Sequence, residues 1–240
     1  MANKEPGKVY LVGAGPGDPE LLTRKALRLI RSADVILYDA LVGDGIRDLF
    51  PPGVVLVDVG KRADRHRYPQ EEINRMLVDM AASYGRIVRL KGGDPYVFGR
   101  GSEEAMELAR AGISFEVVPG ITSAIAVPAR AGIPVTHRGL SSSVTLVTGH
   151  EDPGKGESSV DYRALAALGG TIVILMGIER LEENVRALLA AGKSPDTPVA
   201  IVESGTTGGE RVTTGTLGDI VEKAGTHGVA APAIIVIGEV

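Results

Sequence analysis

The chain is built from short apolar runs that end in glycine turns and are followed by stretches with helical spacing. The run VYLVGAG at residues 9–15 leads into such a turn, and ADVILYD at 33–39 follows a helical stretch. Short apolar runs bounded by glycine predict buried strands, whereas apolar residues at intervals of three and four predict helices. Alternation of the two is typical of α/β layers with largely parallel pairing. We therefore predict an α/β fold.

Several further helices and strands follow the same pattern. Residues 19–31 carry apolar side chains at helical spacing, which predicts one continuous helix. Residues 69–85 predict an amphipathic helix that stops at Gly85, because glycine readily adopts the left-handed conformation that ends helices. Shorter helical patterns cover 103–112 and 179–192. Further strands are expected at 54–60, 86–94, 115–120, 142–150, 170–177, 197–205 and 230–240.

A helical stretch at 119–132 separates two groups of expected strands. At 240 residues the chain is long enough for one large domain or two small ones, each with a core of its own. We predict two α/β domains, residues 1–120 and 121–240. The polar, glycine-containing segment 151–161 is expected to form a loop.

The turn at residues 13–18, GAGPGD, matches part of a dinucleotide-binding fingerprint. Asp18 stands where GxGxxG requires its third glycine, and Pro16 lacks the backbone N–H that a pyrophosphate needs. Asp39 follows the next strand at about the distance of a ribose-binding acid. A dinucleotide-binding oxidoreductase or sensor therefore stays open as an alternative. The turn better suits a ligand that approaches without phosphates, such as S-adenosylmethionine.

Composition narrows the classes of function. The chain has no cysteine, so disulfides, thiolate metal sites and thiolate nucleophiles are excluded. Its net charge of -4 argues against a broad nucleic-acid surface. No apolar run approaches the ~20 residues that cross a bilayer, and the opening MANKEPGK is polar. We expect a cytoplasmic protein that binds neither membrane nor nucleic acid.

Two basic segments contrast with the acidic net charge. Residues 60–74 include Lys61, and residues 86–101 include Arg89 and Arg100, each segment following an expected strand. Open α/β folds place ligand sites at such strand ends, and arginine binds carboxylates through paired hydrogen bonds. A single arginine would be an ordinary surface charge, but two clusters favour a polyanionic substrate. RNA is the competing ligand, and the stacking aromatics that it requires are sparse.

Several short motifs run from Val9 to the end of the chain. They are GAGPGDPELLT, YDALV, VGKR followed by PQEEIN, VRLKGGDPYVFGRG, VPGITSA, AGIPVTHRG, VTGH and a late MG. Together they resemble the tetrapyrrole methylase family, and RLKGGDPYVFGRG with GKR and GIPVTHR resembles its members that methylate uroporphyrinogen III. The resemblance implies two α/β domains with the active site in the cleft between them, and a homodimer.

The resemblance also implies the chemistry. Two S-adenosylmethionine molecules would each give a methyl group to a ring carbon of uroporphyrinogen III, leaving S-adenosylhomocysteine and precorrin-2, the branch point to sirohaem and cobalamin. An electron-rich pyrrole attacks the sulfonium methyl directly, so no metal is expected, and the enzyme holds the two in line. The many carboxylates of this small-molecule tetrapyrrole would explain the clustered arginines.

The resemblance assigns roles to individual residues. Asp39 of YDALV looks like the family's proton acceptor and Lys61 of GKR like its proton donor. Arg89 and Arg100 look like residues that bind the substrate or support the site. The residues that resemble the family's cofactor contacts are Pro16, Gly92, Gly93, Asp94, Val97, Thr122, Ser123, Met176, Gly205 and Ala233.

Ordinary structural roles fit several of the same residues. Asp39 could be a turn acid, and Lys61 a solvated lysine. Arg89 and Arg100 could form ordinary ion pairs with Glu103, Glu104 or Asp94. Thr122 and Ser123 could cap a helix, and Met176 could fill a core. Two related activities also stay open, namely methylation of a later corrin-ring intermediate and methylation of diphthamide or ribosomal RNA.

Overall fold

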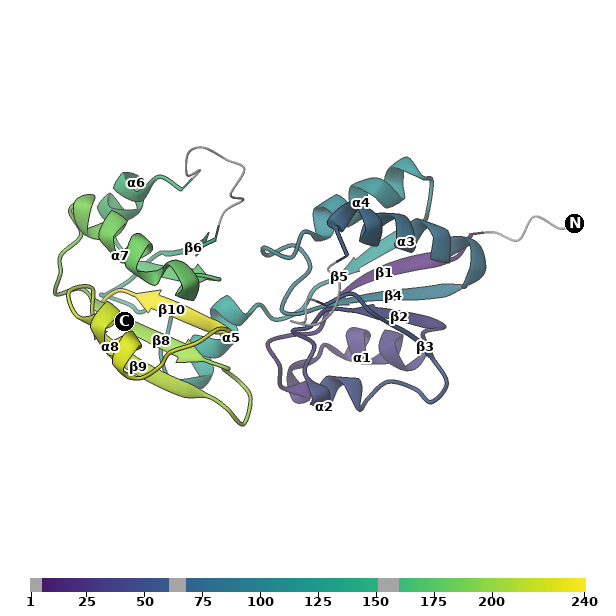
Figure 1. Cartoon of the computed structure of the whole chain (residues 1–240), viewed down its shortest axis with the longest axis horizontal. Coiled ribbons are helices and arrows are strands. Elements are labelled where there is room, and N and C mark those ends of the chain that lie inside the picture. Colours follow the sequence, from purple (N-terminus) through teal and green to yellow (C-terminus); the bar gives the residue numbers. More distant parts are fainter. Residues whose placement is uncertain (1–5, 61–67, 151–159) are drawn as a thin grey trace, which may run out of the picture. The chain divides into compact units, whose positions relative to one another are not determined.

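The computed structural model describes residues 6–60, 68–150 and 160–240, and the chain divides into two compact units, Met1–Thr122 and Ser123–Val240. Each unit contains one five-stranded sheet with helices packed on both of its faces (Figure 1). The predicted α/β fold with two sheets is confirmed.

The sheet of the first unit is entirely parallel, as predicted. Its order is β3-β2-β4-β1-β5, so β4 and β1 lie in its interior. Parallel strands buried on both faces read as continuous apolar runs, which is how β1 and β2 appear in the sequence. The strands are β1 (Lys8–Gly13), β2 (Val35–Tyr38), β3 (Val55–Asp58), β4 (Arg86–Lys91) and β5 (Phe115–Val118).

Helices cover the two faces of this sheet in pairs (Figure 1). The helices α3 (Gln70–Ser83) and α4 (Gly101–Arg110) pack on one face, where Ile87 joins their apolar residues in one core. The helices α1 (Arg24–Arg31) and α2 (Asp44–Arg47) pack on the other face against Val88 and Leu90. Alternate residues of β4 therefore face opposite layers.

The sheet of the second unit is mixed, and here the prediction of largely parallel pairing is wrong. Its order is β6-β7-β10-β8-β9, and only β6 and β7 pair in parallel. The apolar runs indicate burial on both faces, but burial does not specify strand direction. The strands are β6 (Val144–Thr148), β7 (Thr171–Leu175), β8 (Pro198–Glu203), β9 (Arg211–Thr216) and β10 (Ala233–Ile237).

Three helices pack on one face of the second sheet and one on the other. The helices α6 (Tyr162–Ala167), α7 (Leu181–Ala190) and α8 (Ile220–Thr226) share a core with Ile235. The helix α5 (Ser123–Arg130) packs on the opposite face, and the 3-10 turn η2 (Ile178–Arg180) precedes α7. No helix within the described ranges is long and apolar enough to cross a membrane.

Two predicted helices differ from the observed ones at their ends. The expected helix over 19–31 is a 3-10 turn, η1 (Pro19–Leu21), followed by α1, because Thr23 accepts a hydrogen bond from the Ala26 N–H and starts a new helix. The helix α3 ends at Ser83, and Gly85 does not terminate it through a left-handed conformation. The Gly85 N–H instead donates to Asp34 Oδ2 at 3.0 Å.

Candidate active site

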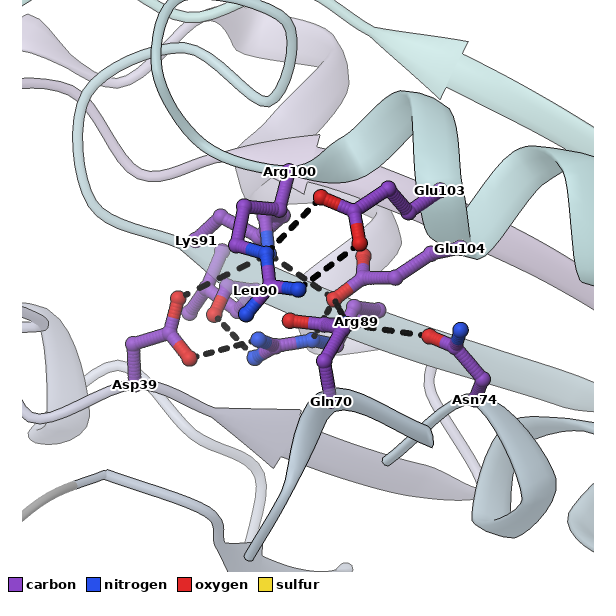
Figure 2. A network of polar contacts seen from close by, with 9 residues as sticks. All are labelled: Asp39, Gln70, Asn74, Arg89, Leu90, Lys91, Arg100, Glu103 and Glu104. Carbon is purple, nitrogen blue, oxygen red and sulfur yellow. Dashed lines mark hydrogen bonds and ion pairs between the residues drawn. The ribbon is translucent and has the colours of Figure 1, made fainter. Parts of the chain in front are cut away.

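Charged side chains gather where two parallel strands of the first sheet end (Figure 2). Asp39 directly follows β2, and its N–H donates to the Leu90 carbonyl of β4 at 3.3 Å. Arg89 and Lys91 are two residues apart on β4, so their side chains leave the same face of the sheet. Glu104 approaches that face from the first turn of α4. Parallel pairing therefore brings these four residues together from three elements.

Arg89 is the centre of this group and is only 2% exposed. Its Nη2 donates to Asp39 Oδ1 at 2.6 Å, its Nε to Glu104 Oε1 at 3.0 Å, and its Nη1 to the Leu90 carbonyl at 3.3 Å. A buried guanidinium is tolerated only when it is paired and hydrogen-bonded. The contact with Asp39 fixes a carboxylate that is itself 29% exposed.

Lys91 adds a second buried cation beside the first. Its Nζ lies 2.9 Å from Glu104 Oε1 and 3.9 Å from Asp39 Oδ2, and the second distance is too long for a hydrogen bond. Gln70 of α3 also donates to Glu104 Oε1 at 3.3 Å and to Asn74 Oδ1 at 2.9 Å. Glu104 is thus held by both strand β4 and helix α3.

The buried cations respond differently to their surroundings. Burial lowers the pKa of Lys91, the charge of Arg89 lowers it further, and Glu104 and Asp39 only partly oppose this. Burial also acts to lower the pKa of Arg89, but Asp39 and Glu104 outweigh it, so that the pKa of Arg89 is raised. Arg89 is therefore a permanent charge, whereas Lys91 can lose its proton more easily than an exposed lysine.

Arg100 lies at the surface end of the network. It adopts a left-handed conformation with φ of 57° at the start of α4, and its guanidinium binds both carboxylate oxygens of Glu103, at 2.8 and 2.7 Å. The hydrogen bond to Glu103 raises the pKa of Arg100, and the same bond lowers the pKa of Glu103. Ion pairing with Glu103 was the alternative to substrate binding, and the two roles are compatible for an exposed guanidinium.

Three glycines cross closely at the ends of β1, β4 and β5. A Cβ on Gly13 would lie 2.5 Å from Gly120 Cα and 2.7 Å from the Gly93 carbonyl oxygen. Gly15 and Gly93 also exchange two backbone hydrogen bonds, at 3.1 and 2.7 Å. The GAGPG turn that contains Pro16 is thereby joined to the GGD loop. Glycine is required at these positions because the backbones approach each other closely, and not only because a ligand needs room.

The carboxylate of Asp94 joins the GGD loop to the PGIT loop. Its Oδ2 accepts from the Gly120 N–H at 3.0 Å and its Oδ1 from the Tyr96 N–H at 2.8 Å. Val97 is half-buried in the same loop, with its N–H near the Asp94 carbonyl. Among the predicted cofactor contacts, the structure brings together Pro16, Gly92, Gly93, Asp94 and Val97.

In the second unit the predicted contacts follow the ends of three paired strands. Met176 follows β7, Gly205 lies two residues after β8, and Ala233 begins β10, where it pairs with Glu203 of β8. Because β10 is antiparallel to its neighbours, its first residue lies at the edge where β7 and β8 end. The mixed sheet thus gathers these three residues at one edge.

The backbone at this second edge is strained. Met176 is 51% exposed and has φ of 55°, and Ser204 and Thr206 on either side of Gly205 have φ of 46° and 65°. A left-handed conformation at a residue other than glycine costs about 1–2 kcal/mol, and such strain is concentrated at functional sites. Helix α5, which begins at Ser123 immediately after Thr122, approaches closely, since a Cβ on Gly205 would lie 2.7 Å from Val127 Cγ2.

Two outcomes concern the catalytic and dinucleotide predictions. The Oδ1 atom of Asp39 binds a buried guanidinium, a partner that its assignment as a ribose-binding acid does not predict. Lys61, the predicted proton donor, lies outside the described residues. Arg89 has all three of its nitrogens committed within the protein, which favours its predicted role as a support for the site.

Sequence reasoning missed Gln70 and the distinct position of Lys91, and it named Glu104 only as one of three acids able to pair with Arg89 or Arg100. One signal was available for Lys91, because Arg89 and Lys91 alternate with apolar residues in a strand that is otherwise buried. Two cations on one buried face require acidic partners. The sequence does not say which of several nearby acids supplies them, since Glu103 and Glu104 differ only in which side of α4 they occupy.

Comparisons with known proteins agree with this geometry. The family model for Tetrapyrrole (Corrin/Porphyrin) Methylases matches residues 8–221. An S-adenosyl-L-methionine-dependent uroporphyrinogen III methyltransferase from Methanosarcina barkeri is 60% identical over 98% of this chain and 92% of its own. A siroheme synthase from Aeromonas hydrophila is 52% identical over the whole chain, which spans 50% of that relative.

A solved structure gives the same result for the fold. The uroporphyrin-III C-methyl transferase from Thermus thermophilus, complexed with S-adenyl homocysteine, is 43% identical with a TM-score of 0.83, covering 97% of this chain and 92% of the other. The family model covers most of the chain, and the relatives are similar along nearly its whole length. Both findings agree with the arrangement of the motifs. The chain therefore belongs to the tetrapyrrole (corrin/porphyrin) methylase family.

Proposed function

We propose that this protein transfers methyl groups from S-adenosylmethionine to two ring carbons of uroporphyrinogen III, giving precorrin-2. The observation that carries the proposal is the 60% identity, across nearly the whole chain, to a methyltransferase with this cofactor and substrate. The buried network that presents Asp39 at the carboxyl edge of a parallel sheet supports it, because α/β folds place ligand sites at that edge.

Asp39 is the proposed proton acceptor. S-adenosylmethionine supplies an electrophilic methyl on sulfur, to which a nucleophilic pyrrole carbon bonds as the bond to sulfur breaks. The methylated ring system must then lose a proton. Asp39 is suited to take it, because Arg89 fixes one carboxylate oxygen while the side chain stays partly exposed. Lys61 is proposed as the proton donor on the strength of the GKR motif.

The proposed cofactor contacts lie in both units. Pro16, Gly92, Gly93, Asp94, Val97 and Thr122 belong to the first unit, and Ser123, Met176, Gly205 and Ala233 to the second. Their chemistry fits the ligand. Small residues leave backbone groups accessible to an adenosine, an exposed methionine side chain offers a soft apolar contact, and the carboxylate of Asp94 is compatible with a sulfonium cation.

The proposed substrate contacts involve Arg100 directly and Arg89 indirectly. Arg100 is exposed and permanently charged, and guanidinium groups bind carboxylates in a bidentate manner. Its partner Glu103 must then yield to a substrate carboxylate or share the guanidinium with it. Arg89 supports Asp39 by donating a hydrogen bond to its Oδ1 atom. We also propose a homodimer, a cytoplasmic location and delivery of the product to sirohaem or cobalamin synthesis, on the basis of the family resemblance.

The test is an anaerobic assay with uroporphyrinogen III and S-adenosylmethionine, in which products are followed by mass. We expect a gain of two methyl groups and release of two equivalents of S-adenosylhomocysteine. Oxidised uroporphyrin is the matched control, because its aromatic ring lacks the nucleophilic pyrrole carbons and should gain none. Binding of S-adenosylhomocysteine without any transfer would reject the substrate, and later corrin-ring intermediates would then be tested.

A further inference from the structure

Glu104 is the most deeply buried acid of the network, and the proposed chemistry does not use it. It is 0% exposed, and three donors, from Arg89, Lys91 and Gln70, converge on its Oε1 (Figure 2). Its Oε2 is buried and has no hydrogen-bond partner among residues 6–60, 68–150 and 160–240. Leaving a buried carboxylate oxygen unpaired is unfavourable, so stability alone does not account for this residue.

The charges of the network balance only because Glu104 is present. Two cations, Arg89 and Lys91, face two carboxylates, Asp39 and Glu104. Arg89 contacts both carboxylates, whereas Lys91 is close to only one of them. Its Nζ is 2.9 Å from Glu104 Oε1 and 3.9 Å from Asp39 Oδ2. Asp39 therefore has a single hydrogen-bonded cation among these residues.

Without the Glu104 charge, Lys91 would have one carboxylate left within reach. A buried ammonium that loses its partner is strongly unfavourable. The flexible lysine stem allows Nζ to move the short remaining distance to Asp39 Oδ2. Both oxygens of Asp39 would then be bound by cations, and a carboxylate held in this way is a poorer proton acceptor.

We propose that Glu104 is a positioning residue that holds Lys91 away from Asp39, so that one oxygen of Asp39 stays available to accept a proton. The inference rests on the proposed role of Asp39 in methyl transfer. Glu104 acts through Lys91 and Arg89 and does not itself touch the reacting atoms. Its buried position, within hydrogen-bond distance of both cations, is the geometry that this role requires.

The experiment compares Glu104→Gln with Glu107→Gln on the same helix. Glu107 is partly exposed and pairs with Arg110 at the surface, so its variant should match wild type. We expect Glu104→Gln to lower kcat by about 10- to 100-fold, with the KM for S-adenosylmethionine and the affinity for S-adenosylhomocysteine within about twofold of wild type. A variant that had merely lost its structure would lose cofactor binding as well.

The double variant Glu104→Gln with Lys91→Met makes the test specific. It removes one anion and one cation, and the pair of Arg89 and Asp39 is left balanced. If Glu104 acts by restraining Lys91, the double variant should recover kcat to within about tenfold of wild type, a positive coupling between the two sites. If Glu104→Gln does not fold, the double variant alone tests the inference. Its kcat should still lie within about tenfold of wild type.

Three results would overturn the inference. Unchanged kcat in Glu104→Gln would show that Lys91 does not interfere with Asp39. A double variant that binds S-adenosylhomocysteine but turns over no faster than Glu104→Gln would show that Glu104 or Lys91 acts in another way. Absence of turnover in both wild type and Glu107→Gln would reject the proposed function, and this inference with it. The two controls therefore distinguish failure of the proposed function from failure of the role of Glu104 alone.

Discussion

The two sheets have different edges at the places where the predicted site residues lie. In the first, parallel strands end side by side and bring the partly exposed Asp39 close to the buried Arg89, Lys91 and Glu104. In the second, a mixed sheet places Met176, Gly205 and Ala233 at one edge, and the buried acid there, Glu203, is neutralised by Arg211 of the adjacent strand. A buried charge network distinguishes the first edge, whereas the second has one cross-strand ion pair and three left-handed residues other than glycine.

Under the proposed function, the two edges have different tasks. Proton transfer requires charges held in a low-dielectric layer, and an all-parallel sheet covered by helices on both faces supplies that layer. A ligand that is held by its shape requires backbone groups set at particular angles, and left-handed residues supply those. The predictions below test whether the two edges respond to substitution in the ways that this contrast requires.

The largest effect is expected where glycines of the first edge cross. Gly120→Ala would place a methyl group 2.7 Å from Gly13 Cα, and because backbone cannot move aside easily, we expect a loss of at least ~3 kcal/mol of unfolding free energy. Gly205→Ala in the second unit would meet three side-chain carbons of Val127 and no backbone atom among its nearest contacts, so we expect a smaller loss of about 1–2 kcal/mol. Thermal unfolding would measure both.

Gly208→Ala is the control for these variants, since a Cβ there meets nothing within 4 Å. Equal losses at Gly120 and Gly205 would contradict the contrast between a backbone crossing and a side-chain contact.

Asp39→Ala is expected to lower kcat by about 100-fold or more, because the proposed proton acceptor is removed. The affinity for S-adenosylhomocysteine should stay within about twofold of wild type, as measured by calorimetric titration. Asp44→Ala, which alters an exposed aspartate of the same unit, is the control. Turnover unchanged in Asp39→Ala would remove this residue from the mechanism.

Arg100→Ala is expected to raise the KM for uroporphyrinogen III by about tenfold, because a charge-assisted contact with a carboxylate is lost. Cofactor affinity should be nearly unchanged. Arg110→Ala, at the other end of the same helix, removes an exposed arginine that is also paired with a glutamate and is the matched control. Equal effects of Arg100→Ala on substrate and cofactor would count against its assignment to the substrate.

Substitutions of Met176 test whether the left-handed backbone at the second edge lowers stability. Met176→Gly and Met176→Ala remove the same proposed cofactor contact, and both should weaken S-adenosylmethionine binding. Because φ is 55°, the glycine variant should exceed the alanine variant in unfolding free energy by about 1 kcal/mol. If alanine proved the more stable of the two, the left-handed conformation would not be a source of strain.

The smallest effect concerns a surface cluster of three charged side chains in the first unit. Glu116 of β5 binds Lys25 and Lys8, and these hydrogen bonds lower the pKa of Glu116 from its ordinary value of 4.5 to about 2. A depressed carboxyl pKa contributes stability above the unfolded value, and that contribution is lost as pH falls towards 2. Glu116→Gln should therefore be slightly less stable than wild type near neutral pH and equal to it near pH 2.

Solvent and salt make the Glu116 effect small. The three side chains are partly exposed, so water and dissolved ions screen the pairs. Chemical unfolding of both proteins at several pH values would measure the difference. A difference that persisted unchanged at pH 2 would show that the charge of Glu116 is not its cause.

Sequence periodicity predicted most elements because burial on one or both faces leaves a direct pattern of apolar residues. It did not predict β9 or the short helices α2, α6 and α8, since the edge strand RVTTGT is largely polar and helices of four to seven residues carry little periodicity. Periodicity also did not predict the directions of the strands in the second sheet. A buried run such as AIIVI in β10 is equally apolar whether its neighbours run parallel or antiparallel.

The candidate site was predictable to the extent that its residues follow strand ends. Asp39 and Arg89 could be named from motifs, but their contact depends on the register that aligns Leu37 with Arg89. Glu104 could be named only as one of three possible ion-pair partners, because its burial depends on how α4 packs against the sheet. Three-dimensional packing, not local pattern, decided which acid the buried cations bind.

The crossing of Gly13, Gly93 and Gly120 has a consequence for how such a chain can change over time. The three positions are far apart in the sequence, so a side chain at one of them cannot be accommodated by adjusting its own neighbours along the chain. Accommodation would require simultaneous rearrangement of two distant loops. Random mutagenesis under selection for folding should therefore retain glycine at all three, and altered specificity must arise from residues around this crossing instead of within it.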